Sequence, residues 1–202
     1  EEQVIVVGNG SACVVGGHAC IIKKGQRFIS NSAIASMGYD LPAAIGACMA
    51  VQEGYVQENG AQEGRMQERD AQEGHMQQPV SQLTGSDIIL VTGDGSFGMN
   101  LNELATAVTN QTPVVVFIMN NGVLGMVRQW QTLFFDKHYS NTTLERKTDF
   151  VKLAEAFGMP GYRAMNMAEL KEVLPKAFAE KGPVQEDMPF LADGTPVDIV
   201  LN

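Results

Sequence analysis

The sequence contains little cysteine, histidine and tryptophan, and it has no run of basic residues. Cys13, Cys20 and Cys48 form no Cys-x-x-Cys pair, so neither a zinc site nor a disulfide framework is predicted. Because 23 acidic residues outnumber 14 Lys and Arg, the net charge is −9 and a nucleic-acid partner is not expected. No apolar run approaches the ~18 residues of a membrane span, so no membrane association is expected.

The length of 202 residues suits a single domain, and 45% apolar residues suffice for a buried core. The unpaired cysteines and the lack of a recognisable signal segment favour a reducing, cytoplasmic compartment. The chain starts at Glu1 rather than Met and enters a strand pattern almost at once. We therefore expect it to be a piece of a longer protein.

Apolar runs of strand length alternate with patterns of helical period along most of the chain. The expected strands are residues 4–7, 27–29, 87–92, 113–119 and 197–201. The expected helices are residues 12–22, 41–51, about 100–110, one starting near Gly122, one capped by Thr148 or Asp149, and one around 170–178 that Pro175 should kink or shorten. This alternation predicts an α/β fold, an open and mostly parallel sheet with helices on both faces.

Residues 51–80 interrupt this rhythm with three decapeptides, VQEGYVQENG, AQEGRMQERD and AQEGHMQQPV. A period of ten advances about 280° beyond whole turns of an α-helix, so no helical face is maintained. Too few apolar residues recur to favour a stacked solenoid, the alternative for such repeats. The segment is predicted to be a flexible, solvated loop insertion at about 51–84, in which weak metal binding by His75 and the glutamates is a minor alternative.

Two polar motifs follow consecutive predicted strands. Gly93–Ser96, with the sequence GDGS, comes after the first, and Asn120-Asn121 comes after the second. Ligands of open α/β sheets bind at the carboxyl ends of the strands. Asp94 and Asn121 offer hard oxygen ligands to a divalent cation, and the glycines let backbone N–H groups approach an anion. The pattern indicates a metal-bridged phosphate, whereas the spacing excludes an EF-hand and a P-loop.

The GDGS motif, 23 residues and then Asn120-Asn121 is similar to the signature of thiamine-diphosphate-dependent enzymes. Gly8–Ser11 resembles their second diphosphate-contacting loop, and Ala35–Ala47 resembles the segment that holds the aminopyrimidine. Asn121–Gln131, continuing to His138–Ser140, resembles the catalytic subunit of acetohydroxyacid synthase, also called acetolactate synthase. The resemblance implies that residues 1–202 form the C-terminal, diphosphate-binding domain, with the thiamin-diphosphate-binding fold.

The resemblance also implies how the cofactor is held at its diphosphate end. Asp94, Asn121 and the Val123 carbonyl would bind Mg²⁺, which would clamp the diphosphate. The phosphate oxygens would also be approached by residues of the two glycine-containing loops, which are Asn9, Gly10, Ser11, Gly93, Gly95 and Ser96.

Further roles follow at the other end of the cofactor. Met37 would wedge thiamine diphosphate into its bent form, and the Ala35 carbonyl would accept a hydrogen bond from its amine. Met126 would lie close to the cofactor, and Trp130 would line the pocket of the acceptor substrate. The competing interpretations are that Met37 is a core residue and that Trp130 is a core or interface aromatic.

Several positions depart from the synthase pattern, among them Ser11, Ala12, Asp40 and the Asn31–Ala35 run, and these lean toward thiamine-dependent decarboxylases. The resemblance as a whole implies decarboxylation of pyruvate and condensation with a second 2-keto acid, in branched-chain amino-acid synthesis. The alternatives are another thiamine-dependent 2-oxoacid decarboxylase subunit and an inactive cofactor-binding fragment.

The resemblance predicts that essential parts lie outside this chain. The activating glutamate would come from a pyrimidine-binding (PYR) domain, carried by another polypeptide or by the rest of the same enzyme. A middle domain would hold FAD in the full-length synthase. We also expect a homo-oligomer, to which a regulatory small subunit could bind. The chain alone should bind thiamine diphosphate and Mg²⁺ weakly and turn over no substrate.

Overall fold

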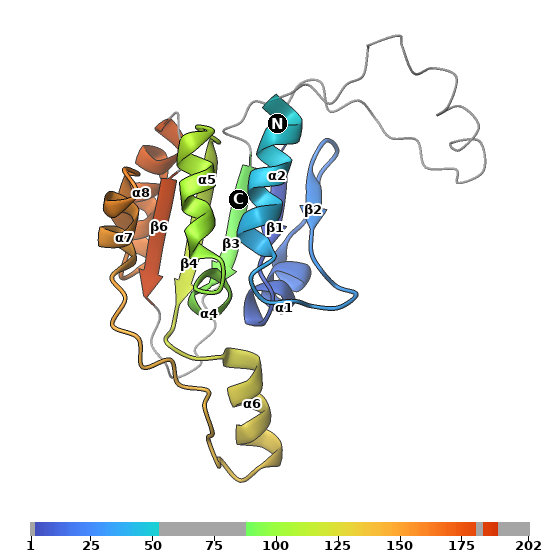
Figure 1. Ribbon diagram of the computed structural model, residues 1–202. Coiled ribbons are helices and arrows are strands. Elements are labelled where there is room, and N and C mark those ends of the chain that lie inside the picture. Colours follow the sequence, from blue (N-terminus) through green and yellow to red (C-terminus); the bar gives the residue numbers. More distant parts are fainter. Residues whose placement is uncertain (1–2, 53–87, 181–183, 190–202) are drawn as a thin grey trace, which may run out of the picture.

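The structure is a computed structural model that describes residues 3–52, 88–180 and 184–189 (Figure 1). Within these ranges six parallel strands form one sheet in the order β2-β1-β3-β4-β6-β5. The strands are β1 (Val4–Val7), β2 (Arg27–Ile29), β3 (Ile88–Gly93), β4 (Val114–Asn120), β5 (Gly161–Arg163) and β6 (Val184–Pro189). The predicted parallel α/β sheet is confirmed.

Helices cover both faces of this sheet. The helical elements are α1 (Ser11–Ala19), α2 (Asp40–Gln52), α4 (Asp94–Phe97), the 3-10 turn η2 (Leu101–Glu103), α5 (Leu104–Thr109), α6 (Gly125–Phe134), α7 (Phe150–Ala156) and α8 (Met167–Ala179). Buried residues of α2, α4, α5 and α7 pack on one face, and those of α8 pack on the other. α1 lies on the α8 side, where a Cβ at Gly16 would stand 3.0 Å from Val7 Cγ1.

The central strands are apolar on both sides because both of their faces are covered. In β4, Val114, Val116 and Ile118 enter the core beneath α2 and α5, whereas Val115 and Phe117 enter the core beneath α8. Successive side chains of a strand point to opposite faces, so an unbroken apolar run serves two cores at once.

The strand order reverses between β1 and β3. The chain passes from β1 to β2 on one side and later returns to β3 on the other side of β1. This reversal is the topological switch point at which open α/β sheets bind ligands. Gly8 N donates to Val91 O at 2.7 Å and ties the two strand ends together there.

Two helix predictions need correction. The helix expected from about Asn100 to Asn110 consists of η2 followed by α5, and it starts only after Asn100, which has a non-helical φ of −132° and donates its side-chain amide to Gly38 O. The helix expected near Gly122 begins only at Gly125, since the φ of +67° at Gly122 is a left-handed turn conformation.

The helix around Pro175 is also longer than expected. α8 continues through Pro175 to Ala179, so the expected shortening is wrong. Leu170 and Ala177 on either side are buried against the sheet, and this packing offsets the hydrogen bond that proline cannot donate. The predicted cap of α7 is Asp149, which accepts a hydrogen bond from Lys152 N at 3.3 Å.

Strands β5 and β6 were not predicted, because one is short and the other has the polar sequence VQEDMP. The strand predicted at 197–201 and most of the insertion at 51–84 lie outside the described residues. Within the described ranges, the structure contains no helix that is both long and apolar enough to cross a membrane.

Candidate functional site

Three glycines border open space at the carboxyl ends of β1, β3 and β4. A Cβ built on Gly10, Gly93 or Gly122 would meet no heavy atom within 4 Å. Gly10 and Gly122 have φ values of +94° and +67°, a region that other residues rarely occupy. The backbone at these three loop ends is therefore accessible to a ligand that lies along the edge of the sheet.

Asp94 connects the end of β3 to the loop after β4. It begins α4 and is only 5% exposed. Burial raises the pKa of its carboxyl group, while the charge of Arg146 and backbone N–H groups of Gly95 and Gly122 act in the opposite direction. The structure thus brings Asp94 to the loop that carries Asn121 and Val123, as the motif spacing predicts.

The loop after β4 is held by a short antiparallel pairing. Leu124 N donates to Thr142 O at 2.8 Å, and Leu144 N donates to Gly122 O at 2.7 Å. Asn121 Oδ1 accepts a hydrogen bond from Val123 N at 3.1 Å. These bonds fix the predicted metal-binding loop from both sides of the Gly122 turn.

The Gly8–Ser11 loop reaches two other parts of the site. Asn9 Nδ2 donates to Ala35 O, the carbonyl predicted to bind the cofactor amine. This carbonyl can still accept a second hydrogen bond through its other lone pair. Ser11 lies at the start of α1, and a Cβ at Gly125 would stand 2.5 Å from Ser11 Oγ and 3.8 Å from Asn121 Nδ2. The β1 and β4 loops are therefore neighbours.

Residues 35–40, called here the 35–40 segment, lie across the end of β3. Gly38 N donates to the buried Ser96 Oγ at 2.9 Å, and Asn100 Nδ2 donates to Gly38 O at 2.6 Å. Ala35 adopts a left-handed φ of +56°, which is unusual for alanine and typical of functional loops. The segment is thus fastened through Gly38, directly after Met37, to α4 and to the residue before η2.

Met37 lies over Gly95. A Cβ at Gly95 would be 3.4 Å from Met37 Cε, 2.9 Å from Leu124 Cδ2 and 3.5 Å from Leu144 Cδ1. Met37 is half-buried and forms no part of the described core clusters, so the interpretation of Met37 as a core residue is not favoured.

Met126 and Trp130 lie on α6, which projects beyond the sheet edge in Figure 1. Trp130 is 61% exposed, and its ring contacts Phe134 edge-on with centroids 6.0 Å apart. The interpretation of Trp130 as a core aromatic is therefore wrong. The structure does not bring Trp130 into the Asp94 loop cluster, and its role toward a substrate stays a prediction.

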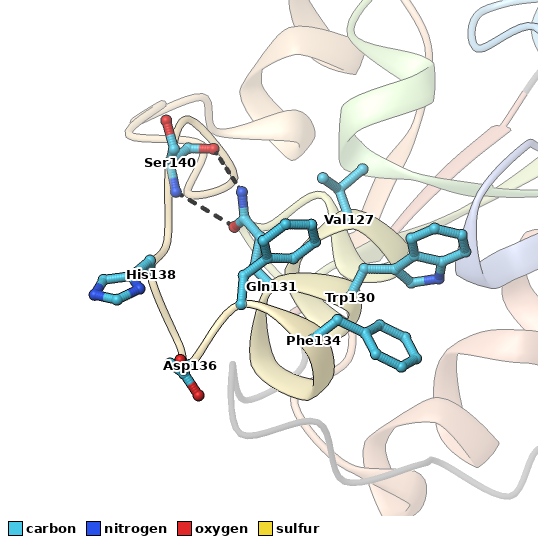
Figure 2. Close-up of a pocket in the computed structure, with 8 residues that line it drawn as sticks. Val127, Trp130, Gln131, Phe134, Asp136, His138 and Ser140 are labelled. Carbon is cyan, nitrogen blue, oxygen red and sulfur yellow. Dashed lines mark hydrogen bonds between the residues drawn. The ribbon is translucent and has the colours of Figure 1, made fainter.

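Trp130 instead lines a separate pocket of about 550 Å³ (Figure 2). Its wall is mostly aromatic and aliphatic, and Gln131 exchanges hydrogen bonds with Ser140 at 3.1 and 3.3 Å across the turn. The lining residues are Val127, Trp130, Gln131, Phe134, Phe135, Asp136, His138 and Ser140.

Sequence reasoning missed several residues that build this site. Leu144 closes over Gly95, Thr142 accepts the Leu124 N–H, and Arg146 Nη1 reaches Asp94 O at 3.5 Å. Thr92 donates to Asp40, which the sequence marked only as a departure from a family pattern. No local pattern identifies these residues, since each acts on a partner at least 18 positions away.

The donor set at the loop cluster suits a magnesium-bound phosphate. It offers a buried carboxylate, a side-chain amide and backbone groups, and Mg²⁺ takes few protein ligands because phosphate and water supply the others. No group of three His, Cys, Asp or Glu that could hold a metal occurs among the described residues. The carboxylate, amide and backbone groups of the loop cluster fit the diphosphate and magnesium that the motifs predict.

A parallel sheet covered by helices on both faces, with accessible glycines in the loops after β1, β3 and β4, defines an open α/β ligand-binding domain. The chain belongs to the family described as thiamine pyrophosphate enzyme, C-terminal TPP binding domain, whose sequence profile matches residues 8–65 and 74–186. The predicted family is confirmed.

Acetolactate synthases are among the related proteins. The chain is 35% identical to the mitochondrial acetolactate synthase catalytic subunit of Saccharomyces cerevisiae over 184 residues. This aligned stretch covers 87% of this chain and 22% of the relative. It is 34% identical over 158 residues to the Escherichia coli acetolactate synthase isozyme 2 large subunit, covering 78% and 23%. Acetolactate synthase of Mycobacterium bovis is 32% identical over 182 residues, covering 88% and 24%. The chain thus spans about a quarter of each relative.

Proposed function

We propose that this chain binds thiamine diphosphate and Mg²⁺ as the C-terminal part of an acetolactate synthase. The observation that carries the proposal is the position of the buried Asp94 carboxyl group at the end of β3, beside the Gly122 loop that follows the neighbouring strand β4. The similarity to acetolactate synthases over most of the chain supports the choice of enzyme.

Asp94, Asn121 and the Val123 carbonyl would hold Mg²⁺. Backbone N–H groups of Gly10, Ser11, Gly95 and Ser96 would face the phosphate oxygens, which the open space beside the loop glycines allows. Among these protein ligands only Asp94 would contribute a negative charge, and its burial would strengthen the attraction to the cation by lowering the local dielectric. The bound cofactor would supply the centre that stabilises a carbanion after loss of carbon dioxide.

The overall reaction would decarboxylate pyruvate and join the remaining two-carbon unit to a second 2-keto acid, giving precursors of branched-chain amino acids. Met37 would support the bent cofactor from its position over Gly95, and Trp130 on α6 would line the acceptor pocket. A thiamine-dependent decarboxylase remains the second candidate, because Asp40 and the Asn31–Ala35 run depart from the synthase pattern. Product analysis separates the two, since an aldehyde indicates the decarboxylase.

The remainder of the enzyme would complete the site. Large apolar side chains are exposed on α6 and around α1, which suits surfaces covered by a PYR domain or a second copy. These side chains are Val14, Val15, Ile21, Ile22, Ile34, Val127, Trp130, Leu133 and Phe134. We further propose that the activating glutamate comes from the PYR domain and that FAD binds only to the full-length enzyme. The enzyme would assemble as a homo-oligomer in the cytoplasm. A regulatory small subunit would be a further partner.

Titration calorimetry with thiamine diphosphate and Mg²⁺ tests the binding proposal on the 202-residue chain. We expect weak, Mg²⁺-dependent binding that Asp94→Ala abolishes. Glu155→Ala, which removes an exposed carboxylate of α7, is the matched control and should bind like the wild type. Absence of binding by the wild type, or binding unaffected by Asp94→Ala, contradicts the proposal. Acetolactate formation by the chain alone would contradict the need for a second domain.

A further inference from the structure

Asp40 and Thr92 form a buried polar pair directly behind the loop cluster. Both residues are 0% exposed, and Thr92 Oγ1 donates to Asp40 Oδ2. Asp40 ends the 35–40 segment and begins α2, whereas Thr92 is the residue before Gly93 in β3. The pair therefore links the 35–40 segment to β3, the strand directly before Asp94.

The fold makes specific room for this pair. A Cβ at Gly8 would stand 2.5 Å from Asp40 Oδ2 and 2.6 Å from Thr92 Oγ1, so only glycine leaves space for the carboxyl group at the end of β1. Asp40 Oδ1 is buried and has no hydrogen-bond partner among the described residues. Burying a polar atom without a partner is costly, and buried carboxyl groups are uncommon in places where an apolar residue would serve.

Apart from their mutual hydrogen bond, the backbone of Thr92 is held more firmly by the rest of the fold than the 35–40 segment that ends at Asp40. Thr92 lies in β3 and is in register with Ile118 of β4, so the sheet fixes its backbone. Residues 35–39 lie outside any strand or helix, and they depend on side-chain bonds such as Gly38 N to Ser96 Oγ and Tyr39 Oη to Val7 O at 2.7 Å. Loss of the pair should therefore displace this segment and leave the β3 end in place.

We propose that Asp40 and Thr92 are positioning residues that set the pyrimidine-binding segment relative to the diphosphate-binding loops. This inference rests on the proposed function, in which Met37 and Ala35 meet the pyrimidine half of the cofactor. Neither Asp40 nor Thr92 contacts the cofactor in this scheme. Their effect is to keep Met37 over Gly95, so that both halves of one ligand find their contacts simultaneously.

The test compares two ligands on the 202-residue chain, thiamine diphosphate with Mg²⁺ and inorganic diphosphate with Mg²⁺, by titration calorimetry. For Thr92→Val we expect about tenfold weaker binding of thiamine diphosphate, which corresponds to ~1.4 kcal/mol, and less than about twofold change for inorganic diphosphate. Thr92→Ser retains the hydroxyl donor and should restore wild-type affinity. A general loss of structure would weaken both ligands together.

Thr112→Val is the matched control, because Thr112 is also 0% exposed and donates to Ala107 O at 3.2 Å, at the opposite end of the sheet. It should change neither affinity. If Thr92→Val does not fold, the double variant Thr92→Val with Asp40→Asn removes the unpaired carboxylate and should show the same selective loss. Equal loss for both ligands, or none, overturns the inference while leaving the proposed function intact. Failure of the wild type to bind either ligand overturns the proposed function and the inference with it.

Discussion

The terminal methyl group of Met37 lies over Gly95, with Met37 Cε 3.4 Å from where a Cβ on Gly95 would stand. The contact joins two segments that are 58 residues apart in the sequence, counted from 37 to 95. One segment is predicted to hold the pyrimidine of the cofactor and the other its diphosphate. In the proposed function, the spacing of these two segments would limit the length of ligand that the site accepts.

Gly95→Ala should weaken binding of thiamine diphosphate by about tenfold, roughly 1.4 kcal/mol. The new methyl group would lie 2.9 Å from Leu124 Cδ2 and force Leu124 and Met37 outward. Calorimetry measures the affinity, and Gly46→Ala is the control, since a Cβ there meets nothing within 4 Å. Gly46 lies within α2, so its replacement should slightly raise the thermal midpoint and leave binding unchanged. Unaltered affinity of Gly95→Ala would show that the contact is not needed.

Asp94→Asn should raise the thermal midpoint of the magnesium-free chain at neutral pH. Burial raises the pKa of Asp94 above its ordinary 3.8, so the folded state holds its proton to higher pH than the unfolded state does. The wild type therefore loses stability as the pH rises from 3.8 through the raised pKa, whereas the asparagine side chain does not titrate. Differential scanning calorimetry from pH 3 to 8 should show the gap widening over this interval. A constant gap would contradict the prediction.

Magnesium should reverse the order of these two proteins. A cation on the Asp94 carboxylate stabilises the folded wild type in proportion to its occupancy, and the neutral amide of the Asp94→Asn variant cannot supply the charge. With saturating Mg²⁺ and inorganic diphosphate, the wild type should melt at the higher temperature. No Mg²⁺-dependent shift of the wild type would argue against a metal at Asp94.

Asp149 stabilises the start of α7 in two ways that can be separated. Its side chain accepts hydrogen bonds from Arg163 at 2.6 Å and from Lys152 N at 3.3 Å, and chiefly the bond from Arg163 lowers its pKa below 3.8. Asp149→Ala loses the cap and the ion pair, and should lower the thermal midpoint by about 2–4 °C. Asp149→Asn keeps a capping oxygen and should lose less.

The pH dependence checks the ionic part of this effect. Because the folded-state pKa of Asp149 is lowered, its contribution is present above 3.8 and is lost as the pH falls through the lowered value. The midpoints of the wild type and Asp149→Asn should therefore converge in strong acid. Divergence on acidification would contradict the assignment.

Phe134→Ser on α6 should change the free energy of unfolding by less than about 0.5 kcal/mol, because Phe134 is 70% exposed. It should reduce fluorescence of an apolar dye bound to the chain, since Phe134 and Trp130 form one exposed aromatic pair. Phe150→Ser, which alters a buried residue of α7 in edge contact with Phe97, should instead destabilise strongly. A large loss of stability from Phe134→Ser would show that α6 packs more tightly than described.

The local pattern of apolar and polar residues was sufficient to predict much of the fold. The runs 88–92 and 114–119 contain apolar residues at nearly every position, which is the signature of a strand buried on both faces, and both became central strands. The sequence predicted a cap at Thr148 or Asp149 because Phe150 and Ala154 follow at helical spacing, and the structure selects Asp149. Strand β6 was not recognisable, because its hydrogen bonds to β4 and β5, rather than its composition, make it a strand.

For the site, motif spacing placed Asp94 and Asn121 at neighbouring strand ends, and the pairing of β3 with β4 brings their loops together. Trp130 shows the limit of such reasoning, because its motif says nothing about the direction in which α6 leaves the sheet. Its distance from the loop cluster depends on the turn at Gly122 and on the pairing of Val123 with Thr143.

The sequence by itself determined the fold class, the family and the residues that end β1, β3 and β4, because these depend on side-chain period and short motifs. Only the tertiary structure decided which of those residues meet. Asn9 reaches Ala35, Thr92 reaches Asp40 and Gly95 lies beneath Met37 because parallel strands place distant loops at one edge of the sheet. The physical reason is that each such contact depends on strand order and register, which are set by burial across the whole sheet rather than by neighbouring residues in the chain.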